Sequence, residues 1–196
     1  MVRVYVDDLV IIGANCDDIK QFKKEMANAF KMSDLDLLCY YLDIEVRQSA
    51  RGTSISQGAY VAKILERSGM AGCNPCQVPM ATRLKLSKRS TEPLVDATAY
   101  RNIMGSLRYL VNTRPDLAFA VGYVSHLLEE PRKDHLAAVK QILRYVRGTK
   151  SWGLKYERKE EQVQLTGFSD SDFAGDVDAR KSTTGVIFFL ANSPIT

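Results

Sequence analysis

The chain has 196 residues, of which 45% are hydrophobic and 26% are charged, an ordinary composition for a globular protein with one large domain or two small ones. No apolar run reaches the roughly 18 residues that a membrane-spanning helix needs, and Asp7 and Asp8 interrupt the N-terminal run before it could act as a signal peptide. Composition therefore argues against a membrane protein. We expect a soluble intracellular protein, with cytoplasm, nucleus and organelle left open.

The four cysteines are too few and too irregularly spaced for the disulfide framework of a small secreted protein, so a reducing compartment fits them. Cys73 and Cys76 have the spacing of a metal or redox pair. However, no second pair follows, and the only histidines, His126 and His135, lie far along the chain. A metal or redox function for this pair is therefore the weaker interpretation.

Charge is unevenly distributed along the chain, whose net charge is +4. Residues 1–48 carry six basic and nine acidic side chains, whereas residues 131–150 carry six basic side chains against one acid, Asp134. The second stretch is a candidate for meeting phosphates. Its bases are Arg132, Lys133, Lys140, Arg144, Arg147 and Lys150.

The first predicted element is a hairpin. Two β-branched runs at residues 2–6 and 9–12 flank Asp7 and Asp8, which places both carboxylates at the tip. Asn15 can then cap a helix whose apolar residues recur at helical spacing to about Phe30.

A second β-region follows. Residues 40–47 alternate between apolar and polar side chains and predict one strand, which turns at residues 51–52 and returns along residues 53–57. The apolar residues between 60 and 65 indicate a short helix that Gly69 can terminate. This pattern is typical of the α+β class.

Residues 72–93 contain three prolines and few large apolar side chains, which predicts a linker or an extended crossing. It is the best internal boundary of the chain. The segment also carries a basic cluster of Arg83, Lys85, Lys88 and Arg89.

Three helices are predicted beyond the linker. Asp96 can cap the first, Pro115 suits the opening turn of the second, and Gly148 can end the third, over about residues 133–147. Residues 117–128 are apolar nearly all round, so we expect the second helix to be buried. Together they indicate a small helical bundle.

The C-terminal region predicts a charged turn at residues 157–161 between a strand at 153–156 and strands at 163–170 and 186–191. A hairpin with no following sheet or helices makes a poor domain by itself, so the chain looks cut from something larger.

Adjacent aspartates at a hairpin tip can hold divalent magnesium with hard oxygen ligands, as a two-metal polymerase requires. A solvated turn containing Asp7 and Asp8 is the alternative, and the dipeptide alone favours it.

The surrounding residues change this balance, because the sequence YVDD at residues 5–8 and the apolar run after it resemble the palm hairpin of reverse transcriptases. Further motifs, in family order and over essentially the whole chain, resemble one subfamily, the copia-type retrotransposon polyproteins. They are SLRYL (106–110), NTRPDL (112–117), RYVRGT (144–149), GFSDSDFAG (167–175) and RKSTTG (180–185).

The resemblance implies an α+β fold made of a partial reverse-transcriptase palm, a helical thumb or connection region and an incomplete ribonuclease H-like sheet. Residues 1–70 would be the end of the palm with the following hairpin and helix, and residues 71–95 the linker. Residues 96–156 would be the thumb or connection, and residues 157–196 the start of ribonuclease H.

Carried over by motif, Asp7 and Asp8 would be catalytic metal ligands of the polymerase, and Asp170 the first catalytic metal ligand of ribonuclease H, with Mg²⁺ or Mn²⁺ as the ion. Asp172, Asp176 and Asp178 are weaker candidates for the second site. The resemblance also favours phosphate contact over a merely solvated surface for the bases of residues 131–150.

The family's remaining carboxylates are expected outside this chain, so both sites would be incomplete and the isolated chain inactive. The expected binding partners are an RNA/DNA template-primer or RNA/DNA hybrid and, for the polymerase site, the missing upstream palm. We expect no membrane partner. Alternatives are a non-catalytic nucleic-acid-binding module and a remnant without function.

Three residues depart from the family's usual pattern. Asp36 and Asp43 stand where glycine is usual, and Phe173 stands where tryptophan is usual. If those glycines serve turns or close approaches of the backbone, aspartate would strain the fold there.

Overall fold

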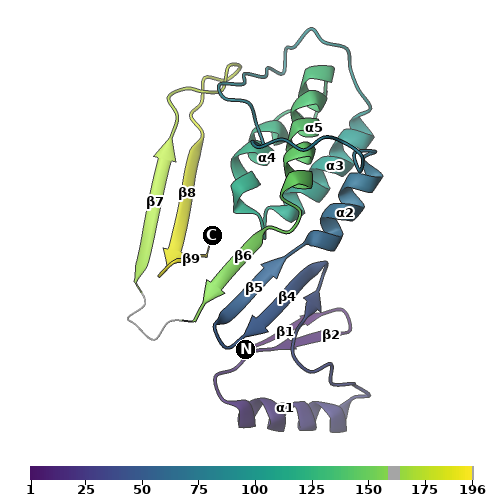
Figure 1. Ribbon diagram of the computed structural model, residues 1–196, viewed down its shortest axis with the longest axis vertical. Coiled ribbons are helices and arrows are strands. Elements are labelled where there is room, and N and C mark those ends of the chain that lie inside the picture. Colours follow the sequence, from purple (N-terminus) through teal and green to yellow (C-terminus); the bar gives the residue numbers. More distant parts are fainter. Residues whose placement is uncertain (159–163, 196) are drawn as a thin grey trace. The chain divides into compact units, whose positions relative to one another are not determined.

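The computed structural model describes residues 1–158 and 164–195 and divides into two compact units, Met1–Cys39 and Tyr40–Thr196 (Figure 1). Five α-helices and three small antiparallel sheets make up the described part of the chain, which confirms the α+β class. No helix within it is long and apolar enough to cross a membrane.

The first unit contains the predicted hairpin and helix. Strands β1 (Val2–Tyr5) and β2 (Asp8–Ile11) pair so that Tyr5 lies opposite Asp8, and helix α1 (Cys16–Ala29) follows. The side chain of Asn15 accepts a hydrogen bond from the amide of Asp17 at 2.9 Å, as expected of a helix cap. None of the residues 1–39 is fully buried, so this unit has no closed core of its own.

The second unit begins with a four-stranded sheet in the order β3 (Tyr40–Tyr41), β4 (Ile44–Ser49), β5 (Gly52–Ser56) and β6 (Gly153–Glu157). The prediction of one strand over residues 40–47 is therefore wrong. Leu42 and Asp43, with φ of 49° and 60°, turn the chain back on itself and separate β3 from β4.

Both aspartates at the family's glycine positions have a left-handed backbone, with φ of 61° at Asp36 and 60° at Asp43. Both positions thus have the backbone conformation for which glycine is favoured and aspartate is strained. Asp43 also accepts hydrogen bonds at 2.7 Å from the Tyr40 hydroxyl and the Lys63 ammonium, and the bond from Lys63 holds the pKa of Asp43 below its ordinary value. These bonds offset part of the cost of the backbone conformation.

The pairing of β5 with β6 joins residues about a hundred positions apart, and it depends on glycine. A Cβ at Gly153 would lie 2.0 Å from the carbonyl oxygen of Ile55, and one at Gly52 would lie 2.1 Å from that of Tyr156. Any side chain at either position would separate the two strands.

Four helices form the core of the second unit: α2 (Gly58–Arg67), α3 (Ala97–Leu110), α4 (Ala118–Ser125) and α5 (Lys133–Gly148), with a short 3₁₀ helix, η1 (Pro115–Leu117), before α4 (Figure 1). The side chain of Asp96 caps α3. The largest apolar side chains with less than 2% exposure are Tyr100, Met104, Leu107, Leu110, Leu117, Ile142, Leu143 and Val61.

The expectation that the helix after Pro115 is buried holds for only one of its faces. Val121 and Val124 are buried, but Phe119 is 61% exposed. The eight residues of α4 contact α3 and α5 along one face, and the apolar sequence continues around to the side that faces solvent.

The predicted linker has neither helix nor regular strand between α2 and α3, apart from a bridge of Leu94 to Arg132. It is nevertheless anchored to the helices. Leu86 is buried, its amide donates to the hydroxyl of Tyr123 at 3.0 Å, and that hydroxyl donates to the carbonyl of Leu84.

The C-terminal sheet contains β7 (Leu165–Ser171), β8 (Thr184–Leu190) and a short β9 (Ser193–Pro194) that the sequence did not predict. Val163, predicted to start the first of these strands, and residues 159–161 of the predicted charged turn lie outside the described residues.

The buried guanidinium of Arg114 contacts several separate segments of the second unit. It is 2% exposed, and it donates through Nε and Nη2 to both carboxylate oxygens of Asp116, at 2.9 and 2.7 Å. Nη1 and Nη2 also donate to the carbonyl and hydroxyl of Thr149 at 2.9 and 2.7 Å, and the guanidinium lies over the rings of Tyr145 and Trp152. One side chain thus connects η1, the end of α5 and the start of β6.

We expect Arg114→Gln to lower the free energy of unfolding by about 3 kcal/mol, because it leaves a partly buried carboxylate without its cation. Partial burial would raise the pKa of Asp116, but the hydrogen bonds and charge of Arg114 hold it below its ordinary value of 3.8. The carboxylate of the wild type therefore stabilises the fold above about pH 4 and less as the pH falls. Urea unfolding of both proteins should show a difference that shrinks below pH 4.

The control for this prediction is Arg108→Gln, which removes the same charge from an exposed position where the guanidinium donates only to Ser125. Its cost should be about 0.5 kcal/mol. Equal costs for Arg108 and Arg114 would contradict the role assigned to the buried ion pair.

Candidate active site and nucleic-acid-binding residues

The turn between β1 and β2 positions the two candidate polymerase carboxylates. Val6 and Asp7 form the two-residue turn, and Asp8 is the first residue of β2, so only Asp7 lies at the tip and the prediction for Asp8 is corrected by one position. Both aspartates are exposed. Val6 has a φ of 53°, which is unfavourable for a β-branched residue and is a kind of strain that often marks functional turns.

The carboxylates of Asp7 and Asp8 offer the hard oxygen ligands that magnesium prefers. Within residues 1–158 and 164–195, however, no group of three or more histidine, cysteine, aspartate or glutamate side chains could hold a metal ion.

Asp170, the candidate for the ribonuclease H site, lies on β7 opposite Gly185 and is exposed. The three weaker candidates all accept hydrogen bonds, two of them from groups of the β7–β8 loop. Asp172 accepts from the amide of Thr183 at 2.6 Å, and Asp176 accepts from the amides of Asp178 and Ala179. Asp178 accepts bonds from the linker instead. Of these four aspartates, Asp170 is the one whose carboxylate accepts no hydrogen bond from another group of the described residues.

Most of the candidate phosphate-binding bases lie along α5. Lys133, Lys140, Arg144 and Arg147 follow one another at intervals of seven, four and three residues, which places them on one side of the helix, and we call these four the basic stripe. Lys133, Lys140 and Arg144 are exposed and Arg147 is half-buried. The opposite side of α5 carries the buried core residues.

Two of the candidate bases also hold the linker. Arg144 donates through Nε to the carbonyl of Asn74 at 2.7 Å, and Arg132 donates to the carbonyl of Glu92 at 2.8 Å. Arg132 is also half-buried, unlike Lys150, which is exposed beyond the end of the helix. Arg132 is thus better placed to support the fold than to meet a ligand.

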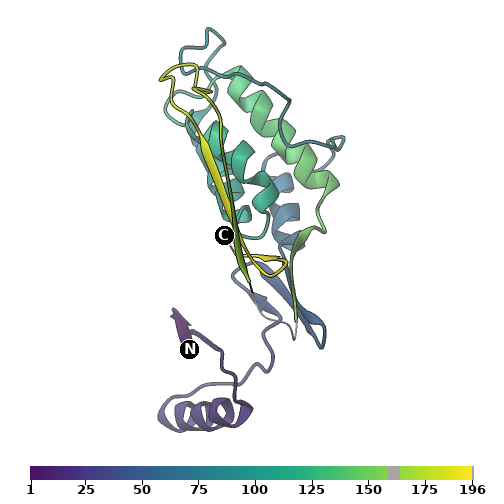
Figure 2. The ribbon, with the colours of Figure 1, turned by 90° about the vertical axis from the view of Figure 1, so that its left-hand side faces the viewer.

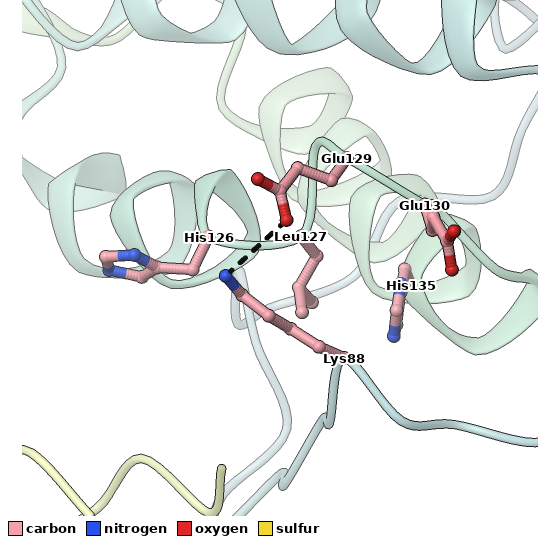
Figure 3. A pocket seen from close by; sticks show the side chains of 6 residues that line it. All are labelled: Lys88, His126, Leu127, Glu129, Glu130 and His135. Atoms are coloured by element: carbon pink, nitrogen blue, oxygen red, sulfur yellow. Dashed lines mark ion pairs between the residues drawn. The ribbon is translucent and has the colours of Figure 1, made fainter. Parts of the chain in front are cut away.

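The buried histidine, His135, is held by hydrogen bonds at both ring nitrogens. His135 is fully buried, its Nδ1 accepts a bond from the amide of Arg132, and its Nε2 lies 3.0 Å from the carbonyl of Ser87. Both ring nitrogens are therefore committed. Figure 3 shows His135 in a small pocket with His126, where the ammonium of Lys88 reaches toward Glu129.

Cys76 is half-buried, and its thiol lies 3.3 and 3.4 Å from the carbonyl oxygens of Val78 and Gln141. The linker thus packs along α5 at this point, and the cysteine has a structural environment.

Comparison with known proteins identifies the family to which the chain belongs. Residues 1–82 match the family model described as reverse transcriptase (RNA-dependent DNA polymerase). The chain is 39% identical over 193 residues to the retrovirus-related Pol polyprotein from transposon RE1 of Arabidopsis thaliana, and 38% identical over 202 residues to that from transposon TNT 1-94 of Nicotiana tabacum. An uncharacterized mitochondrial protein of Arabidopsis thaliana is 36% identical over 95% of this chain and 77% of its own length. The chain belongs to the copia-type retrotransposon Pol polyproteins.

The resemblance in the separated motifs is thereby confirmed at the level of the family, including its reverse-transcriptase region. The chain matches 98% of its own length to the two transposon polyproteins but only 13% and 15% of theirs. No solved structure matches it significantly.

We expect the retrotransposon chain to bind Mn²⁺ or Mg²⁺ through Asp7 and Asp8 only weakly, with a dissociation constant of about 1 mM or more, because two exposed carboxylates leave most ligand positions to water. Line broadening of amide NMR signals by Mn²⁺ should centre on residues 5–9 and disappear in an Asp7→Asn, Asp8→Asn variant. Asp17→Asn, Asp18→Asn is the matched control, since it removes another adjacent pair. Micromolar affinity would contradict an incomplete site.

Proposed function

We propose that this chain contributes part of an RNA-directed DNA polymerase, with Asp7 and Asp8 as metal-binding carboxylates of the palm. The supporting observation is that Asp7 lies in a strained two-residue hairpin turn, with Asp8 directly after it, inside the region that matches the reverse-transcriptase family. A protruding turn can bring two carboxylates to a primer end without burying them beforehand.

In this proposal the subdomains follow the motifs. Residues 1–70 belong to the palm and the hairpin and helix after it, residues 71–95 are the linker, and residues 96–156 form the helical thumb or connection. Residues 157–196 begin a ribonuclease H-like region in which Asp170 is a metal ligand. The exposed, uncommitted carboxylate of Asp170 supports this choice over Asp172, Asp176 and Asp178.

The basic stripe is proposed to bind the phosphate backbone of an RNA/DNA template-primer. Its support is geometric: α5 is fixed by a buried face, so the charged ends of Lys133 and Lys140 project from a rigid base. Each lysine or arginine that meets a phosphate releases a condensed counterion, which makes the affinity strongly dependent on salt.

A second candidate function, a non-catalytic nucleic-acid-binding module, uses the stripe alone. The observation in its favour is that the stripe stands on the well-packed helical core, whereas Asp7 and Asp8 lie in a unit without a buried residue. Under either proposal, Asp7→Ala, Asp8→Ala leaves phosphate binding intact. Magnesium-dependent primer extension after addition of an upstream palm distinguishes the two.

The purified chain should bind a labelled RNA/DNA hybrid with an affinity that falls steeply with salt. Lys140→Gln, Arg147→Gln should weaken binding about tenfold at low salt and lower the salt slope by about two, one for each lost phosphate contact. Arg144 is left in place, because its bond to Asn74 also supports the linker. Fluorescence anisotropy over a salt series measures both quantities.

The matched control for the stripe is Arg47→Gln, Arg51→Gln, which removes two charges from exposed positions of the β4–β5 hairpin. It should leave the affinity nearly unchanged. Binding that is absent at low salt, or equally reduced by both variants, would refute the stripe as a binding surface and favour a remnant without function.

We also expect no templated primer extension by the pure chain in Mg²⁺ or Mn²⁺, because the described carboxylates do not complete a two-metal site. A primed RNA template with all four deoxynucleotides tests this directly. Extension that Asp7→Ala, Asp8→Ala abolishes would show that the chain is an active polymerase. Adding a polypeptide with the upstream palm of a related polyprotein tests whether the site can be completed in trans.

A further inference from the structure

The linker and the β7–β8 loop are joined by a carboxylate that the proposed active sites do not use. Asp178 accepts a hydrogen bond from the hydroxyl of Ser87 and another, at 2.6 Å, from the amide of Lys88. Asp178 lies about ninety positions after Ser87 and Lys88 in sequence, and Figures 1 and 2 show the loop beside the linker at the same end of the helices. We call this contact the Asp178 clasp.

Both sides of the clasp are held in place by their own segments. On the linker, the carbonyl of Ser87 lies 3.0 Å from Nε2 of the buried His135, and its hydroxyl accepts from the amide of Arg89 at 3.0 Å. In the loop, the amide of Asp178 donates to the carboxylate of Asp176, and the amide of Asp176 donates to the carbonyl of Lys181. The clasp thus connects two locally fixed turns.

The clasp gathers basic side chains from both segments. Arg180 and Lys181 follow two and three residues after Asp178. The hydrogen bonds from the Ser87 hydroxyl and the Lys88 amide, and then the nearby charges of Arg89 and Lys88, lower the pKa of the Asp178 carboxyl. The bases exposed here are Arg83, Lys85, Lys88, Arg89, Arg180 and Lys181.

The charge of this surface stays positive after its acids are included. Asp176, Asp178, Glu129 and Glu130 oppose the six bases, which leaves a net charge of +2. Two of these acids are occupied: Asp178 by the clasp, and Asp176 by the amides of Asp178 and Ala179. The carboxylate of Glu129 forms an ion pair with the ammonium of Lys88, at a distance of 4.0 Å.

We infer that the six bases form a second polyanion-binding surface, distinct from the basic stripe, which binds the phosphate backbone of nucleic acid and is assembled by the Asp178 clasp. The inference rests on the proposed function for its ligand. It adds a positioning role for Asp178 and Ser87: they hold Arg180 and Lys181 beside the linker bases, so that one strand of phosphates can contact both segments.

Ser87→Ala tests the assembly without altering charge. The variant removes the hydroxyl donor, weakens the clasp and lets the loop move away, so binding of an RNA/DNA hybrid should fall about fivefold at low salt. Arg180→Gln, Lys181→Gln should reduce the affinity by about tenfold and the salt slope by about two. Because both changes remove the same contacts, Arg180→Gln, Lys181→Gln should cost little more in the Ser87→Ala background.

Amide hydrogen exchange provides a readout that does not depend on nucleic acid. In Ser87→Ala, residues 87–90 and 176–181 should exchange faster together while α3 and α5 keep their protection, which also shows that the variant is folded. Unchanged exchange in both segments would refute the clasp. Equal losses of affinity from Arg180→Gln, Lys181→Gln in the wild-type and Ser87→Ala backgrounds would refute its role in assembling the surface.

The same titrations separate this inference from the proposed function. If Lys140→Gln, Arg147→Gln weakens hybrid binding but Arg180→Gln, Lys181→Gln does not, the stripe binds and the second surface is refuted. If only the loop variant weakens binding, the second surface is supported and the stripe is refuted. A wild-type chain that binds neither hybrid nor single-stranded RNA at low salt would overturn both.

Discussion

The buried guanidinium of Arg114 is the interaction on which the second unit depends most. A desolvated cation is stable only when its hydrogen bonds are satisfied, and here the carboxylate of Asp116 and both oxygens of Thr149 meet that requirement. These residues come from the motifs NTRPDL and RYVRGT, more than thirty positions apart. Satisfying one charge therefore sets the end of α5, and with it the point from which β6 departs toward β5.

The linker has a comparable importance in spite of its lack of regular structure. Its carbonyls and amides are bonded to side chains from α4, α5 and the β7–β8 loop, through Tyr123, His135 and Asp178. A segment without helix or strand must satisfy its backbone groups elsewhere, and side chains from three elements meet part of this need. The linker thereby positions its own bases relative to α5.

Features that depend on local chemistry were predictable from the sequence. The caps at Asn15 and Asp96 and the left-handed Gly69 mark helix ends, since capping involves residues only a few positions apart. The β3–β4 turn was missed because Leu42 and Asp43 adopt a backbone that glycine normally supplies. The β5–β6 pairing and the Asp178 clasp were missed because sequence periodicity carries no information about contacts between distant segments.

For the candidate site too, the sequence indicated neighbouring residues but not the contacts between distant segments. The hairpin turn itself identifies Asp7 and Asp8 as neighbours, whereas the burial of Arg132 and the engagement of Asp172, Asp176 and Asp178 are consequences of tertiary contacts. Composition singled out the linker bases, but only the fold joins the β7–β8 loop to the linker, through Asp178. The motifs therefore indicated candidate residues, whereas the surfaces on which those residues lie depend on tertiary contacts.

The two proposed activities make different demands on stability. Asp7 and Asp8 must keep their geometry on a two-stranded sheet in a unit without buried side chains, and a hairpin of this kind is marginally stable by itself. The basic stripe stands on a helix with seven buried residues, and phosphate binding tolerates small displacements of long, flexible side chains. Substitutions that loosen the fold should therefore abolish catalysis before binding.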